Sequence, residues 1–170
     1  MDFQALVKNR WSVRKFKTDA LPDDVMAQIL EAGRVAPTAC NFQPQRVFVI
    51  RSAEAMEKVK KCTRCHFNAP VVLLVCCDHD TSWKRKYDGA DSGVVDASIV
   101  TTHMMLAAEE LGVGSCWVMH FNPAVLRSEL ALPENMEPVA LLPMGYPAED
   151  AEPIAMHFQR KPLDELVKVL

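Results

Sequence analysis

Helical spacing of apolar residues marks several segments of the chain. The signals predict helices starting at residue 22, over residues 52–61, over residues 94–111 and starting at residue 122. Pro22 followed by two acidic residues suits a first helical turn, and Ser52 and Asn122 can cap the helices that follow them. Gly112 is a typical residue just beyond a helix end. The apolar content of the 94–111 segment predicts that this helix is buried.

Short apolar runs rich in β-branched residues predict the strands. These runs are residues 47–50, 71–75, 115–118 and 139–142. Because the run 71–75 is apolar without alternation, both faces of that strand should be buried. The polar residues 38–44 predict a loop, and residues 163–169 a short terminal helix. Strands interspersed with helices favour an α/β or α+β sheet covered by helices.

The length and composition narrow the class of protein. A chain of 170 residues is expected to form one domain, residues 1–170. Hydrophobic residues make up 49% and charged residues 24%, which is far from the signature of disorder. The net charge of −3 gives no general attraction to nucleic acid or to anionic membrane. Polar and charged residues interrupt the longest apolar stretch, so no transmembrane helix is expected. The first residues do not form a secretory signal, and a cytoplasmic protein is expected.

The six cysteines are expected to be free thiols, with Cys76 and Cys77 in the core. The segment Cys62-Thr63-Arg64-Cys65-His66 matches a short haem-attachment pattern and half of a zinc site. Haem attachment requires export, and zinc requires two further ligands. We therefore interpret these thiols as structural or incidental, with a redox or metal role as the alternative.

Residues 8–17 hold five basic residues and no acid, within an acidic protein. Arginine presents a planar fork of donors that suits phosphate oxygens, and Ser12 adds a hydroxyl between Arg10 and Arg14. The alternative is a solvated basic face. A second basic pair, Arg160-Lys161, lies near the other end of the chain and could converge on the same anion.

Other common chemistries lack their motifs. There is no Gly-x-Gly-x-x-Gly after a strand and no Walker loop. Ser92 does not lie in a nucleophile elbow, so hydrolysis is not expected. His103, within the apolar helix, is interpreted as a core histidine.

Five blocks in order carry a resemblance to a known family. They are residues 10–16 (RWSVRKF), 36–44 (APTACNFQP), 111–117 (LGVGSCW), 143–147 (PMGYP) and 160–162 (RKP). Together they resemble the FMN-dependent nitroreductase family over nearly the whole chain. The resemblance implies an α+β nitroreductase-like fold, with a central, mostly antiparallel sheet flanked by helices. It also implies an intertwined homodimer with two FMN sites at the subunit interface.

The resemblance assigns flavin-binding positions to four segments. They are Arg10, Trp11, Ser12 and Arg14; Pro37, Thr38, Ala39 and Asn41 in a loop from the partner subunit; Trp117, Val118, Met119 and His120 beside the flavin ring; and Arg160 and Lys161. Trp11 stands where arginine is common in the family, and Met119-His120 stands where many relatives have a glycine-alanine pair. The bulkier pair could narrow the pocket or contact a substrate.

The expected function follows from the same resemblance. It is an FMN-dependent NADH or NADPH oxidoreductase that reduces nitroaromatics, quinones or similar small acceptors by a ping-pong mechanism. No separate catalytic residue is expected, because FMN carries the chemistry. The alternatives are a specialised flavin enzyme, such as a dehalogenase or a flavin-fragmenting enzyme, and a non-catalytic flavin- or metal-binding sensor. The segment between Asp78 and Asp91 could form a rim or lid of the pocket, or a plain surface loop.

Overall fold

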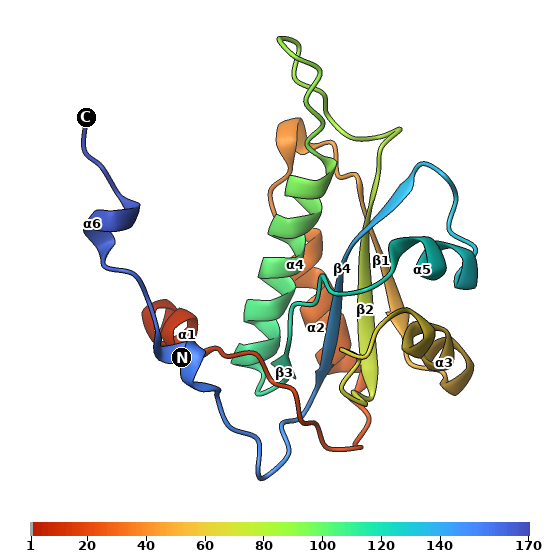
Figure 1. Cartoon of the computed structure of the whole chain (residues 1–170), viewed down its shortest axis with the longest axis vertical. Helices are drawn as coiled ribbons and strands as arrows, with labels where there is room; N and C mark the ends of the chain where they lie inside the picture. The colour runs from red at the N-terminus through yellow and green to blue at the C-terminus, as the bar shows by residue number, and fades with distance from the viewer. Residues whose placement is uncertain (1) are drawn as a thin grey trace.

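The computed structural model describes residues 2–170, and its centre is a four-stranded antiparallel sheet in the order β1-β2-β4-β3 (Figure 1). The strands are β1 (Gln45–Ile50), β2 (Val71–Asp78), β3 (Gly114–Ser115) and β4 (Met136–Gly145). All eight residues of β2 are buried, as the uninterrupted apolar run predicts for a strand covered on both faces. This confirms the α+β class and the antiparallel sheet.

Helices cover both faces of the sheet (Figure 1). One face packs against α2 (Asp23–Arg34) and α4 (Gly93–Glu110), and the other against α3 (Ala53–Cys62) and α5 (Pro123–Glu129). The two buried clusters alternate along β2, so that Cys77 faces α4 and Cys76 faces the opposite layer. The four helices were predicted from their caps and apolar spacing, and the structure confirms them.

The chain ends lie outside these layers. At the amino end, α1 (Phe3–Asn9) is capped by the Asp2 carboxylate, which accepts a hydrogen bond from the Ala5 N–H. After β4 the chain leaves the sheet and carries η2 (Ala155–Phe158) and α6 (Leu163–Leu166) away from it, passing beside α1 (Figure 1). Most large apolar side chains of this tail are exposed. Such a surface suits contact with another molecule.

The structure differs from the sequence predictions in one missed helix and in two predicted elements. The amino-terminal helix α1 was not predicted. The predicted strand 115–118 is interrupted after Ser115, because Cys116 donates to the carbonyl of Pro143 and proline has no N–H to return the bond; the segment pairs with β4 again only at Val118, which bridges Leu141. The predicted helix 163–169 ends at Leu166. A helix of this length depends on packing, and its exposed side chains find none within the chain.

The segment between Asp78 and Asp91 projects beyond the sheet as a narrow loop (Figure 1). A bridge between Lys84 and Asp91 closes its base, and Tyr87 is fully exposed near its tip. Over residues 2–170, no helix combines the length and apolar character needed to cross a membrane.

Candidate functional site

The basic segment is an extended strand-like stretch laid along the edge of the sheet. Ser12 bridges Ser115 in parallel fashion, and the Val13 N–H donates to the Ser115 carbonyl at 2.9 Å. The Val13 side chain is fully buried. It reaches the core because Gly114 lacks a side chain, since a Cβ there would lie 2.5 Å from Val13 Cγ2. With Val13 turned inward, its neighbours Ser12 and Arg14 point to the other side.

The tail meets this segment and closes a cavity of about 200 Å³. The cavity is lined by Arg10, Trp11, Ser12, Arg14, Pro153, Ile154, Met156, His157 and Arg160. Two basic clusters from opposite ends of the chain therefore converge. Lys161 is not among the lining residues, and its ammonium lies 3.7 Å from the Glu165 carboxylate. The lining residues Pro153, Ile154, Met156 and His157 were not predicted, although they lie just before Arg160.

Arg14 and Arg160 leave their positive charge at this cavity without a carboxylate partner among residues 2–170, whereas Arg10 interacts electrostatically with Glu109. Arg14 donates to the Ser12 carbonyl at 3.0 Å, and Arg160 donates to the Gln159 carbonyl at 2.8 Å. Within residues 2–170, neither guanidinium forms an ion pair with a carboxylate. Three arginines and a hydroxyl around one cavity fit an anion with several oxygens, such as a phosphate.

The 37–41 loop lies elsewhere in the chain, at the other end of α4 (Figure 1). Buried Asp96, in the first turn of α4, fixes it: one carboxylate oxygen accepts from the Ala39 N–H at 2.9 Å, and the other accepts from the Ser92 hydroxyl at 2.7 Å. Cys40 and Asn41 have left-handed backbone angles, with φ of 49° and 57°. α4 has 18 residues at about 1.5 Å each and is therefore about 27 Å long, and the loop and the arginine cavity lie towards its opposite ends.

The four predicted site residues that follow β3, residues 117–120, lie in different parts of the structure. Val118 is buried and bridges Leu141, and Trp117 is half-buried. Met119 is exposed and lines a cavity of about 430 Å³ with residues of β4 and α5. His120 lines a separate cleft beside α3, where its carbonyl accepts from the Thr63 hydroxyl. One chain therefore does not gather all the sequence-predicted site residues around one cavity.

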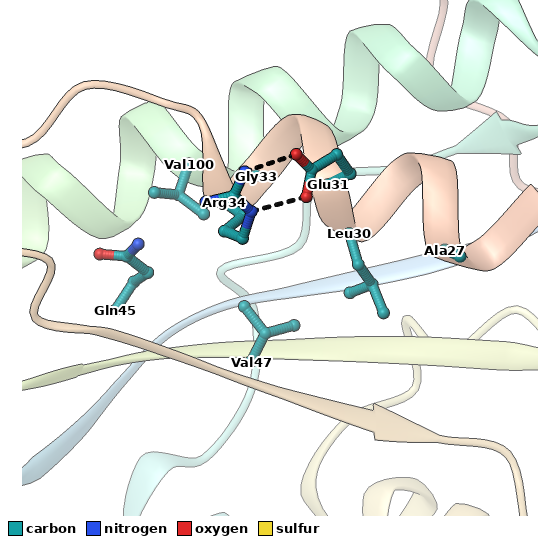
Figure 2. A pocket seen from close by; sticks show the side chains of 8 residues that line it. All are labelled: Ala27, Leu30, Glu31, Gly33, Arg34, Gln45, Val47 and Val100. Atoms are coloured by element: carbon teal, nitrogen blue, oxygen red, sulfur yellow. Dashed lines mark hydrogen bonds and ion pairs between the residues drawn. The ribbon is translucent and has the colours of Figure 1, made fainter.

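A further cavity of about 360 Å³ lies between α2 and β1 (Figure 2). Apolar side chains line most of it, and Figure 2 shows Glu31 and Arg34 paired with each other at its rim. Their atoms are 2.6 and 2.7 Å apart, and the hydrogen bond from Arg34 lowers the pKa of Glu31. Since the pair neutralises its own charge, this cavity does not offer an anion site.

The cysteine predictions are confirmed in part. The six cysteines are free, and Cys76 and Cys77 are buried. Burial raises the pKa of Cys76 to about 12. In the 62–66 segment, the Cys62 thiol donates to the Lys58 carbonyl and His66 Nδ1 accepts from the Asn68 N–H. These groups are used locally, as the structural interpretation expects. His103 is half-buried rather than fully within the core.

A family model described as the nitroreductase family matches residues 7–67 and 60–146. The chain belongs to the nitroreductase family. A protein of Methanothermobacter thermautotrophicus, assigned as an NADH dehydrogenase/NAD(P)H nitroreductase, is 32% identical over 88% of this chain and 80% of its own length.

Solved structures of other nitroreductase family proteins are also similar to this chain. A nitroreductase family protein from Clostridium difficile 630 superposes with a TM-score of 0.93 at 41% identity, covering 99% of this chain and 98% of its own. A protein from Desulfovibrio desulfuricans, assigned as a nitroreductase and solved in complex with FMN, has a TM-score of 0.83 at 30% identity over 96% and 94% of the two chains. This member of the family therefore shares its fold with proteins that include an FMN-bound one.

Proposed function

We propose that this nitroreductase is an FMN-dependent oxidoreductase that takes electrons from NADH or NADPH and passes them to nitroaromatics, quinones or similar small acceptors in a ping-pong sequence. The observation that carries the proposal is the convergence of Arg10, Ser12, Arg14 and Arg160 on one cavity. The relatives named as NAD(P)H nitroreductases and the FMN-bound neighbour support the choice of cofactor and electron donor.

The cavity residues fit the phosphate end of a flavin mononucleotide. Guanidinium forks at Arg14 and Arg160 can each donate two hydrogen bonds to phosphate oxygens, and the Ser12 hydroxyl can donate a further one. Arg10 adds positive charge, and Trp11 supplies an aromatic wall. When bound, FMN would accept a hydride from the nicotinamide and pass electrons to the acceptor. The residues of this chain bind and orient the two substrates, and no acid-base pair is required.

We further propose that the active form is a homodimer in which the 37–41 loop of one chain completes the cavity of the other. Within a chain, α4 holds the loop and the arginines at opposite ends. A two-fold partner with α4 antiparallel would bring each loop to the other chain's arginines. The exposed apolar residues of the tail, such as Phe158, Leu163 and Leu166, would then pack on the partner.

The first test is the visible absorption spectrum of the purified protein, followed by anaerobic addition of NADH and then NADPH. Bound flavin that bleaches with either nucleotide, and recovers colour with a nitroaromatic or quinone, is the expected result. Protein that remains colourless after incubation with FMN would contradict the proposal.

The variant Arg14→Ala tests the residues of the cavity. Losing a charge-assisted pair should cost about 1.5–3 kcal/mol, which weakens FMN binding by about 10- to 150-fold. Arg51→Ala is the matched control, because Arg51 is an exposed arginine that pairs with Asp23 away from the cavity. Fluorescence titration with FMN measures both variants. Equal affinities in Arg14→Ala and Arg51→Ala would remove Arg14 from the site.

A further inference from the structure

Three side chains with metal-binding atoms meet where β2 ends and β4 begins. Cys77 and Glu137 are paired across these strands, and His79 follows Cys77 by two residues. The thiol sulfur, an imidazole nitrogen and a carboxylate oxygen all lie within 4.8 Å of one another. We propose that Cys77, His79 and Glu137 bind one divalent transition-metal ion such as Zn²⁺, at a site that does not depend on flavin.

The spacing of these atoms suits a tetrahedral ion. Cys77 Sγ lies 3.6 Å from His79 Nε2. Two ligands at about 2.0–2.3 Å from a tetrahedral Zn²⁺ lie about 3.5 Å apart, so this pair already has the required separation. Glu137 Oε2 is 2.6 Å from His79 Nε2 and must move outward by about 1 Å to leave room for an ion. Its side chain is half-exposed and free to do so.

A carboxylate behind the imidazole orients it for a metal. Asp91 Oδ2 lies 2.9 Å from His79 Nδ1, and Asp91 is itself held by the Gly93 N–H at 2.7 Å and by Lys84 at 3.3 Å. A histidine that donates its Nδ1 proton to a carboxylate presents Nε2 as the ligand, which is the usual arrangement around protein-bound zinc. Although burial works in the opposite direction, these hydrogen bonds lower the pKa of Asp91, so it remains an acceptor.

The start of α4 packs closely against one side of the cluster, and a cavity lies on the other. At Gly93 a Cβ would lie 3.1 Å from Cys77 Sγ and 3.0 Å from Asp91 Oδ1, so glycine lets α4 begin against these two groups. On the outer side, His79 and Glu137 line the cavity of about 430 Å³ that Met119 also lines. Three protein ligands beside an open cavity leave a fourth position for water or a small ligand.

The donor set selects the class of ion. Thiolate and imidazole favour zinc, cobalt, nickel and copper over magnesium and calcium, which prefer oxygen ligands. On binding, the Cys77 thiol and the Nε2–H of His79 each lose a proton to solvent, and the sulfur and Nε2 become ligands. Without a metal, hydrogen bonds to Asp91 and Glu137 raise the pKa of His79, and the ring stays between two carboxylates. The alternative is therefore a purely structural ion-pair cluster.

The test titrates the full-length protein with Co²⁺ after removal of metals with a chelator. Difference spectra against the same protein without Co²⁺ cancel any flavin absorption. The expected result is one ion per chain, with visible bands of tetrahedral cobalt and a thiolate-to-cobalt charge-transfer band, and displacement by Zn²⁺. No bound Co²⁺, or cobalt bands without the thiolate signature, would overturn the proposal.

Substitutions distinguish residues that bind the metal ion from residues that do not. His79→Ala and Glu137→Gln should each weaken Co²⁺ binding by about 100-fold or more, and Cys77→Ser should remove the charge-transfer band. Asp91→Asn keeps all three ligands and should weaken binding by about 10- to 100-fold with the band retained, as expected of a positioning residue. Cys65→Ser and Glu134→Gln change the same residue types outside the cluster and should bind Co²⁺ as the unmodified chain does.

Circular dichroism of each variant shows whether it is folded. Glu137→Gln is the safest test, because its half-exposed side chain contributes little to the core. Unchanged Co²⁺ affinity in folded Glu137→Gln and His79→Ala would show that the ion binds elsewhere and would overturn the site. FMN content is recorded in the same samples. A chain that binds Co²⁺ as expected but no flavin would contradict the proposed function alone.

Discussion

At the residue scale, Asp96 is a buried charge with its partners in place. Its carboxylate accepts from the Ala39 N–H and the Ser92 hydroxyl, and it lies in the first turn of α4, where the helix dipole favours negative charge. Both donors would lose their partner if the carboxylate were removed. This one side chain therefore couples the start of the longest helix to the 37–41 loop.

Replacing Asp96 by alanine should reduce the free energy of unfolding by about 1–3 kcal/mol, because two donors are left without an acceptor. Asp96→Asn keeps one oxygen acceptor and should recover part of the loss. Ser98→Ala is the control on the same helix, since the half-buried Ser98 hydroxyl donates only to the Val94 carbonyl. Urea unfolding at one fixed protein concentration measures all three. Equal stability of Asp96→Ala and Ser98→Ala would contradict the role given to this carboxylate.

At the element scale, the contact between residues 10–14 and β3 positions the arginine cavity. This contact requires close approach, because Val13 lies where a side chain at position 114 would be. Gly114→Ala should therefore displace the basic segment, cost about 1–3 kcal/mol of stability and weaken FMN binding.

A second substitution separates this clash from other effects of the alanine. Val13→Ala removes the methyl groups that a Cβ at 114 would meet, at the cost of a small cavity. The double variant Val13→Ala/Gly114→Ala should lose less stability than the sum of the losses of the two single variants. A double-mutant cycle measures this coupling. Strict additivity would show that Gly114 is not needed for the approach of Val13.

Some helices and strands could be predicted from the sequence, and others could not. The helices with a cap and a regular apolar face were found within a few residues, and β2 was recognised because a strand buried on both faces is apolar throughout. The position at which β3 ends was not predicted, because it depends on the residue opposite Cys116 in β4. That residue is Pro143, which has no N–H to donate. The Cys77–Glu137 pairing was likewise out of reach, since the register between β2 and β4 shifts after Val75. Arg160 and Arg14 line the same cavity only because of the tertiary fold, and the local sequence of neither segment predicts this.

At the scale of the whole molecule, α4 keeps apart two groups of the site residues of one chain. Arg14 lies with the tail at one end, and the 37–41 loop lies at the other. If each flavin site takes its arginines from one chain and its loop from the partner, the two groups act in trans. A dimer built from two different defective chains then has one intact site and one doubly defective site.

This arrangement predicts complementation between variants. Arg14→Ala removes a phosphate contact, and Asn41→Asp places a carboxylate near the flavin with little change in backbone, because Asn and Asp both tolerate the left-handed conformation at this position. Each homodimer should bind FMN weakly. The heterodimer, co-expressed with two different affinity tags and purified through both, combines the intact arginines of one chain with the intact loop of the other. It should hold about half the flavin of the unmodified dimer and have about half its activity. Flavin content no higher than that of the defective homodimers would mean that each site is built within a single chain, since both of its sites would then carry one defect each.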